Sequence, residues 1–143
     1  MDQRMRVLLV EDDPDHAELI RRGFQNQALN TDLLVVSDGQ EALDFLFGQD
    51  QYADDPPAPP NLILLDLKLP KVSGLEVLKI VKQSQGLCHI PVVILTTSED
   101  RRDIDRAYEY HANSFLVKPS DTAEFNQLLE DLRLYWLDHN YTI

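Results

Sequence analysis

The sequence predicts an α/β domain built on a doubly wound, five-stranded parallel sheet with helices on both faces. Short apolar segments suited to strands alternate five times with amphipathic segments suited to helices. Such alternation favours a parallel sheet, because parallel strands need crossover connections. The chain has 143 residues, the usual size of one domain. We therefore expect a single domain over residues 1–143.

The first two strand–helix units precede a proline-rich segment. A strand is expected at Arg6–Val10, followed by a helix with Asp13 as its N-cap and Pro14 in its first turn. A second strand is expected at Leu33–Val36 and a second helix at Gly39–Phe47. Residues 48–60, GQDQYADDPPAPP, contain four prolines and predict a loop insertion. It could be functional or a passive connector, and passive is the favoured interpretation.

Three further units complete the pattern. Leu62–Leu65 is uniformly apolar, as a strand buried on both faces should be. The last helix is expected to extend from about residue 121 to 138, with apolar residues at spacings of three and four. The other predicted elements are a helix at Ser73–Gln83, a strand at Val92–Leu95, a helix at Glu99–Tyr110 and a strand at Phe115–Val117.

Charge and composition exclude several classes of protein. The formal net charge of −12 disfavours unaided binding to nucleic acid or to anionic lipid, so other proteins are the expected partners. No apolar run reaches the roughly 20 residues of a membrane span, and the N-terminus has no signal-peptide pattern. Cys88 is the only cysteine, so no internal disulfide forms. We expect a cytoplasmic protein.

Polar residues follow four of the predicted strands. They are the acids Glu11, Asp12 and Asp13, the acid Asp66, the hydroxyl residues Thr96, Thr97 and Ser98, and the pair Lys118-Pro119. The carboxyl ends of parallel strands meet at one edge of a sheet, where ligands bind. We therefore expect these side chains to converge. Helix capping alone would explain Asp13, but not acids at the ends of two strands.

Clustered carboxylates without an arginine indicate a cation site. Ligands that are all oxygen favour Mg²⁺, which completes its shell with water and phosphate oxygens. Lys118 and the Thr96 hydroxyl would then hold phosphoryl oxygens, and Asp66 would be the nucleophile that forms an acyl phosphate.

Four strings resemble the receiver domain of two-component response regulators: LLVEDD, LILLDLKLPKVSG, PVVILTTS and SFLVKP. The resemblance covers essentially the whole chain. It implies a flavodoxin-like fold with strand order 2-1-3-4-5, no enzymatic turnover, and phosphotransfer from a histidine kinase to Asp66. It also implies that Asp12, Asp66 and the Lys68 backbone carbonyl bind Mg²⁺ directly, while Glu11 acts through water.

The same resemblance implies a conformational switch. Lys118 would pair with the phosphoryl group, Thr96 would hydrogen-bond to it, and Phe115 would occupy the aromatic switch position. Phenylalanine keeps the rotamer switch of the tyrosine found in many receivers but lacks its hydroxyl. We also expect a cis peptide between Lys118 and Pro119, because X-Pro bonds make cis inexpensive and the lysine must turn toward Asp66.

A narrower resemblance concerns small receivers paired with bacterial and cyanobacterial phytochromes. It rests on QYADDPPAPPNLILLDLKLPK, YEYHANSF and LYWLDH. Those receivers have no output domain. The resemblance implies a phytochrome-type kinase as partner, although many of these receivers replace the Lys-Pro pair that this chain keeps.

We further expect a homodimer through the fourth helix, fifth strand and fifth helix. Exposed aromatic and apolar groups would form the contact: Tyr108 or Tyr110, Tyr135, Trp136 and Leu137.

Two other functions remain open. A phosphatase with an aspartate nucleophile would resemble the haloacid dehalogenases, but their second acid is replaced here by Lys68. A pseudo-receiver that only docks to partners typically lacks a key acid or the lysine, and this chain keeps them.

The four histidines show no metal-ligand spacing, so ordinary surface or core roles are expected for His16, His89, His111 and His139.

Overall fold

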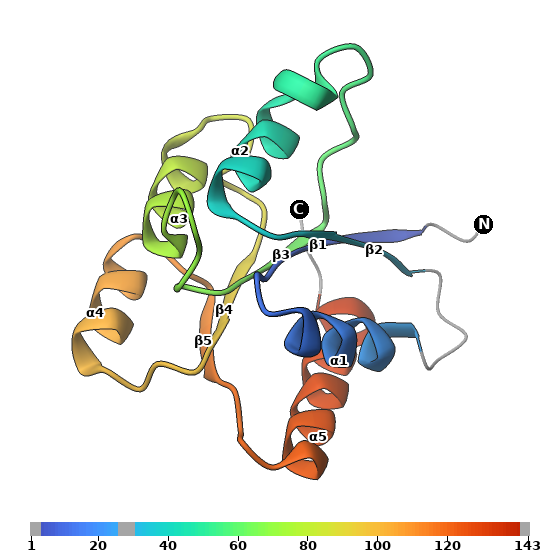
Figure 1. The fold of residues 1–143 in the computed structure, drawn as a ribbon, viewed down its shortest axis with the longest axis vertical. Helices are drawn as coiled ribbons and strands as arrows, with labels where there is room; N and C mark the ends of the chain where they lie inside the picture. The colour runs from blue at the N-terminus through green and yellow to red at the C-terminus, as the bar shows by residue number, and fades with distance from the viewer. Residues whose placement is uncertain (1–3, 26–30, 141–143) are drawn as a thin grey trace.

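The computed structural model describes residues 4–25 and 31–140, which form a parallel sheet with helices on both faces (Figure 1). The strand order is β2-β1-β3-β4-β5, and all four neighbouring pairs are parallel. This confirms the predicted fold class and strand order. The strands are β1 (Met5–Val10), β2 (Thr31–Val36), β3 (Leu62–Leu65), β4 (Val92–Thr96) and β5 (Ser114–Val117).

The helices divide between the two faces of the sheet, as Figure 1 shows. One face carries α1 (Pro14–Gln25) and α5 (Thr122–Arg133). The other carries α2 (Gly39–Phe47), α3 (Gly74–Gln83) and α4 (Arg101–Glu109). The predicted helices agree with these bounds to within one or two residues, except at the end of α5.

The core consists of two apolar layers separated by the sheet. Successive side chains of a strand point to opposite faces. Leu62 and Leu64 of β3 accordingly pack toward α1 and α5, whereas Ile63 and Leu65 pack toward α2, α3 and α4. All four are at most 1% exposed, and each such burial contributes about 1.5–3 kcal/mol. Burial on both faces explains why β3 is uniformly apolar.

Side-chain caps fix where the helices begin. Asp13 Oδ1 accepts hydrogen bonds from the backbone N–H groups of Asp15 and His16, which confirms its predicted role as N-cap of α1. The same device is repeated at the start of α2, α3, α4 and α5 by Asp38, Ser73, Asp100 and Asp121. The first turn of α1 is thereby held next to the end of β1.

The proline-rich insertion is anchored to the domain. It contains a short 3₁₀ helix, Asp50–Tyr52, and the Tyr52 ring packs edge-on against Phe45 with centroids 5.2 Å apart. At its far end, Arg6 Nε donates to the Pro59 carbonyl over 3.0 Å. These contacts hold both ends of the insertion against α2 and β1.

The C-terminal helix changes type where one continuous helix was expected. After Arg133, α5 passes into a π-helical segment, Leu134–His139. Trp136 and Leu137 are half-buried against the core below α1 and α5, while Tyr135 is 53% exposed. The wider π turn therefore folds part of the predicted aromatic contact surface into the domain itself.

Gly74 brings α3 against the backbone that follows β3. A Cβ at this position would lie 2.1 Å from the carbonyl oxygen of Asp66 and 2.6 Å from Leu67 Cα. We expect Gly74→Ala to lower the free energy of unfolding by about 1–3 kcal/mol, because backbone must move to accept it. Denaturant titration measures this. Gly86→Ala is the control, since a Cβ there meets nothing within 4 Å. Equal stability of the two variants would contradict this role for Gly74.

Candidate functional site

Acids from two strand ends converge, as the sequence predicted. Glu11, Asp12 and Asp66 each present a carboxylate oxygen, and these oxygens all lie within 4.8 Å of one another. Glu11 and Asp66 are buried, at 2% and 7% exposure, while Asp12 faces solvent. Glu11 and Asp12 follow β1, Asp66 follows β3, and those two strands are neighbours in the sheet.

Lys118 is paired with the two buried acids of this cluster. Its Nζ donates to Asp66 Oδ2 over 2.9 Å and to Glu11 Oε1 over 2.5 Å. The lysine side chain is only 2% exposed. Its backbone N–H donates to the Thr96 carbonyl over 2.7 Å, which fixes the residue beside β4. The prediction that Lys118 partners the carboxylates is therefore confirmed.

The predicted cis peptide before Pro119 is wrong. The Lys118–Pro119 bond is trans, as are the other described peptide bonds. The reason is the length of the lysine side chain. Lys118 follows β5, and its four-carbon stem reaches Asp66 and Glu11 without any reversal of the backbone.

The two buried carboxylates have different proton affinities. Burial favours the protonated form of Asp66, but the Lys118 hydrogen bond and charge, with hydrogen bonds from Thr96 and the Lys68 N–H, outweigh it and hold the Asp66 pKa below its usual value. Burial dominates at Glu11 and raises its pKa to about 7 against the pull of Lys118. Asp66 therefore loses its proton at a lower pH than Glu11 does.

Thr96 and Lys68 lie beside Asp66, whereas Phe115 packs on the core. The Thr96 hydroxyl helps to lower the Asp66 pKa by hydrogen bonding, and Thr96 is fully buried. Lys68 contributes its backbone N–H, 3.3 Å from Asp66 Oδ1. The Phe115 ring is half-buried and packs toward the core layer of α2, α3 and α4.

Sequence reasoning missed His16. Its Nδ1 lies 3.0 Å from Lys118 Nζ, so it belongs to the same cluster of polar groups. A lone histidine in an amphipathic helix has no pattern that marks it as part of a site. Its place in the first turn of α1, just after the acids at the end of β1, is the one feature that could have indicated it.

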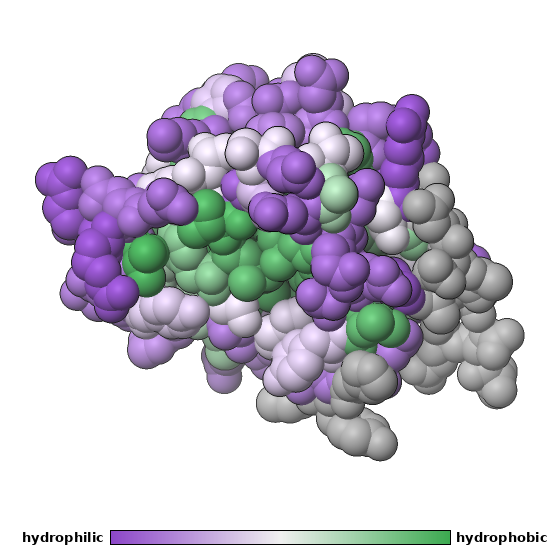
Figure 2. Space-filling model, turned by 90° about the horizontal axis from the view of Figure 1, so that it is seen from below, coloured by the Kyte–Doolittle hydropathy of each residue, from purple (hydrophilic) through white to green (hydrophobic). Residues whose placement is uncertain are grey.

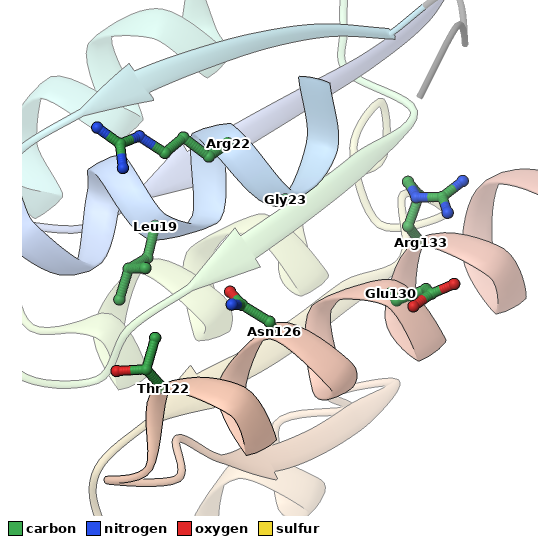
Figure 3. Close-up of a pocket in the computed structure, with 7 residues that line it drawn as sticks. All are labelled: Leu19, Arg22, Gly23, Thr122, Asn126, Glu130 and Arg133. Carbon is green, nitrogen blue, oxygen red and sulfur yellow. The ribbon is translucent and has the colours of Figure 1, made fainter. Parts of the chain in front are cut away.

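Two hollows border α5. One lies beside Lys118 and is lined in part by His16, Pro119 and Phe125. The other lies between α1 and α5, and none of the predicted site residues line it (Figure 3). Within the described ranges 4–25 and 31–140, no helix has the length and apolar character needed to cross a membrane.

Comparison with known proteins agrees with this geometry. Residues 7–130 match the response regulator receiver domain. The probable methanogenesis regulatory protein FilR2 of Methanothrix harundinacea is 42% identical over 134 residues, which cover 94% of this chain and 84% of FilR2. Response regulator Rcp1 of Synechocystis is 38% identical over 132 residues, covering 92% of this chain and 88% of Rcp1.

Solved structures of similar proteins extend the match. The phosphorylated cyanobacterial phytochrome response regulator RcpA has a TM-score of 0.93 at 34% identity, covering 98% of this chain and 99% of RcpA. The Mn²⁺-bound form of Rcp1 has a TM-score of 0.92 at 35% identity, covering 97% and 99%. The predicted resemblance to small phytochrome-associated receivers is thus confirmed. The chain belongs to the response regulator receiver family.

Proposed function

We propose that this protein is a phosphoacceptor in a two-component system, and that a histidine kinase transfers a phosphoryl group to Asp66. The observation that carries the proposal is the buried Asp66 carboxylate, ionised and paired with Lys118 over 2.9 Å, beside two further acids. The whole of residues 4–25 and 31–140 acts as a single domain, and its product is a signalling state rather than a released compound.

The transfer is a nucleophilic displacement at phosphorus. A carboxylate oxygen of Asp66 forms the new P–O bond as the bond from phosphorus to the kinase's imidazole nitrogen breaks, and that nitrogen keeps the electron pair. Lys118 neutralises charge on the phosphoryl oxygens, and the Thr96 hydroxyl hydrogen-bonds to one of them. Lys118 already contacts Asp66 before transfer, so its charge is in place when the phosphoryl group arrives.

The acids also suit a divalent cation. Three carboxylate oxygens within 4.8 Å of one another, one of them from a solvent-facing residue, fit a hard ion that keeps water in its shell. Asp12, Asp66 and the Lys68 carbonyl would hold Mg²⁺ directly, and Glu11 would do so through water. The ion would neutralise charge shared between Asp66 and the phosphoryl oxygens.

The output is a change in a contact surface. Phosphorylation draws Thr96 toward the phosphoryl group and leaves space for Phe115 to rotate, which alters the surface over α4, β5 and α5. β5 is an edge strand, and all four of its residues are only partly buried. Figure 2 shows an apolar area ringed by hydrophilic groups on the side toward which α4, β5 and α5 extend in Figure 1. A second copy of the chain would cover this surface.

The partner kinase is of the phytochrome type, and the setting is the cytoplasm. RcpA is described as a cyanobacterial phytochrome response regulator, and it is similar to this chain over 98% of the chain's length. The strongly acidic composition, with a net charge of −12, disfavours direct binding of nucleic acid.

Incubation with acetyl phosphate and Mg²⁺, followed by intact mass measurement, tests this function. We expect the protein to gain the mass of one phosphoryl group. A second sample, in which Mg²⁺ is chelated before the incubation, should show no gain in mass. Continuous release of phosphate without an adduct would instead indicate an aspartate-nucleophile phosphatase. The absence of any adduct would indicate a pseudo-receiver that acts by docking alone.

Dimer formation is tested by sedimentation with and without the phosphoryl mimic beryllofluoride. Tyr108 of α4 is 49% exposed, so Tyr108→Ala should weaken the activated dimer about tenfold, as expected for removal of an aromatic contact. Phe47→Ala is the matched control, because Phe47 is 40% exposed but lies on α2. A protein that stays monomeric at tens of micromolar with beryllofluoride would rule out the dimer and leave the phosphotransfer chemistry unaffected.

A further inference from the structure

The Lys118 ammonium group has three N–H donors, and the structure provides three acceptors. They are Glu11 Oε1 at 2.5 Å, Asp66 Oδ2 at 2.9 Å and His16 Nδ1 at 3.0 Å. The lysine side chain is 2% exposed, so water has little access to replace any of them. The acceptors come from the ends of β1 and β3 and from the first turn of α1.

We propose that His16 is a positioning residue for phosphotransfer, which holds the Lys118 ammonium in place to receive the charge of the phosphoryl group. The inference rests on the proposed function, in which Asp66 is the acceptor. It assigns His16 no contact with the phosphoryl group. The role is to fix the lysine that makes that contact.

The contact defines the state of the imidazole ring. An ammonium group only donates hydrogen bonds, so Nδ1 must be the unprotonated nitrogen, and the proton of the neutral ring lies on Nε2. Asp13 Oδ2 is 3.6 Å from the same Nδ1, too far for a hydrogen bond. Lys118 is therefore the hydrogen-bond partner of this nitrogen.

His16 matters because the other two acceptors are both carboxyl groups and lie close together. Glu11 is the nearer of the two, and an ammonium held by carboxylates alone could settle toward Glu11 and away from Asp66. A third acceptor on a different element fixes the Nζ position from a third direction. Donors aimed in advance at developing charge contribute strongly to such reactions, and displacements near 1 Å cost large factors in rate.

The alternative role of His16 is packing. Its ring lies 6.0 Å from the Phe125 ring, tilted by 51°, and is only partly exposed. Two substitutions separate the roles. His16→Leu keeps apolar bulk beside Phe125 and removes the acceptor. His16→Asn removes the ring but places Oδ1 as many bonds from the backbone as Nδ1, so it keeps an acceptor within reach of Lys118.

The first measurement is the rate of Asp66 labelling by acetyl phosphate at saturating Mg²⁺. We expect His16→Leu to be about tenfold slower than wild type and His16→Asn to recover to within about threefold. The melting temperature and the calorimetric Mg²⁺ affinity of both variants should stay close to wild type, because the His16 ring contacts Lys118, Asp13 and Phe125 and not the three acids of the proposed metal site.

The second measurement needs no phosphorylation. The ¹⁵Nζ ammonium resonance of Lys118 should be visible in wild type and His16→Asn, and broadened by faster proton exchange in His16→Leu. Labelling of His16→Leu at the wild-type rate would overturn the inference. Slow labelling of His16→Asn with an intact ammonium resonance would also overturn it, in favour of packing. If acetyl phosphate does not label the wild-type protein, the proposed function is contradicted, and so is this role of His16.

Discussion

Replacing Asp66 with asparagine should reduce phosphoryl labelling from close to one group per molecule to background, while the protein stays folded. Asparagine has nearly the same shape as aspartate, but its amide is not a nucleophile. Lys118 keeps its hydrogen bond to Glu11, so the site does not lose its ion pair. Intact mass measurement after incubation with acetyl phosphate and Mg²⁺ gives the result. Asp105→Asn on the exposed surface of α4 is the control and should label like wild type.

Full labelling of Asp66→Asn would contradict the assignment of the nucleophile. Asp12 would then be the next candidate, since it is the exposed acid of the cluster. Loss of labelling accompanied by loss of the fold would be recognised from the circular dichroism spectrum, and Asp66→Glu then serves as a second variant. Glutamate keeps the carboxylate but moves its oxygens by one carbon, so labelling should be slowed rather than abolished.

Lys118→Met should be the most destabilising of the site substitutions in metal-free protein. Methionine keeps a linear, apolar stem but removes the charge, which leaves Glu11 and Asp66 buried without a counter-ion. Breaking one side of a buried ion pair costs about 3–5 kcal/mol. Added Mg²⁺ should recover part of this loss, because a ligand that binds only the folded state stabilises it. Denaturant titrations with chelator and with Mg²⁺ measure both effects, and Arg101→Met, which removes an exposed cation of α4, is the control.

The loss of stability caused by Lys118→Met should also depend on pH. The Glu11 pKa is raised from 4.5 to about 7 even with Lys118 present, and removal of the lysine raises it further. A carboxyl group with a raised pKa in the folded state favours folding below its ordinary pKa, and this advantage is lost as the pH rises. The stability lost by the variant should therefore be smaller near pH 4.5 than at neutrality, and what remains at pH 4.5 reflects the missing Lys118–Asp66 pair. A deficit that is constant across this range would contradict the buried-charge explanation.

The sequence was sufficient to predict the fold and the acidic cluster because both follow from periodicity and from one geometric rule. A uniformly apolar β3 must be buried on both faces, and Asp66 must then lie at the sheet edge where β1 also ends. The contacts that Lys118 and His16 make in the site depend on how far each side chain extends and in which direction. A sequence pattern does not contain that information. For that reason Lys118 was placed in the site but with the wrong peptide geometry, and His16 was missed.

The C-terminal segment shows a second limit of periodicity. The apolar residues at Phe125, Leu129, Leu132 and Trp136 follow helical spacing, which does not distinguish an α-helix from one that widens into π turns near its end. The exposure of aromatic groups was equally hard to predict. Tyr108 faces solvent as expected, whereas Tyr110 packs on the core and lies 5.7 Å below Lys79 Nζ.

The most direct test of the central claim is to locate the phosphoryl group itself. Protein phosphorylated with acetyl phosphate and Mg²⁺ is treated with borohydride, which reduces an acyl phosphate to an alcohol, and its peptides are sequenced by mass spectrometry. We predict that position 66 is recovered as homoserine and that Glu11 and Asp12 are unchanged. Conversion at another acid, with Asp66 intact, would contradict the assignment of Asp66 as the phosphoacceptor.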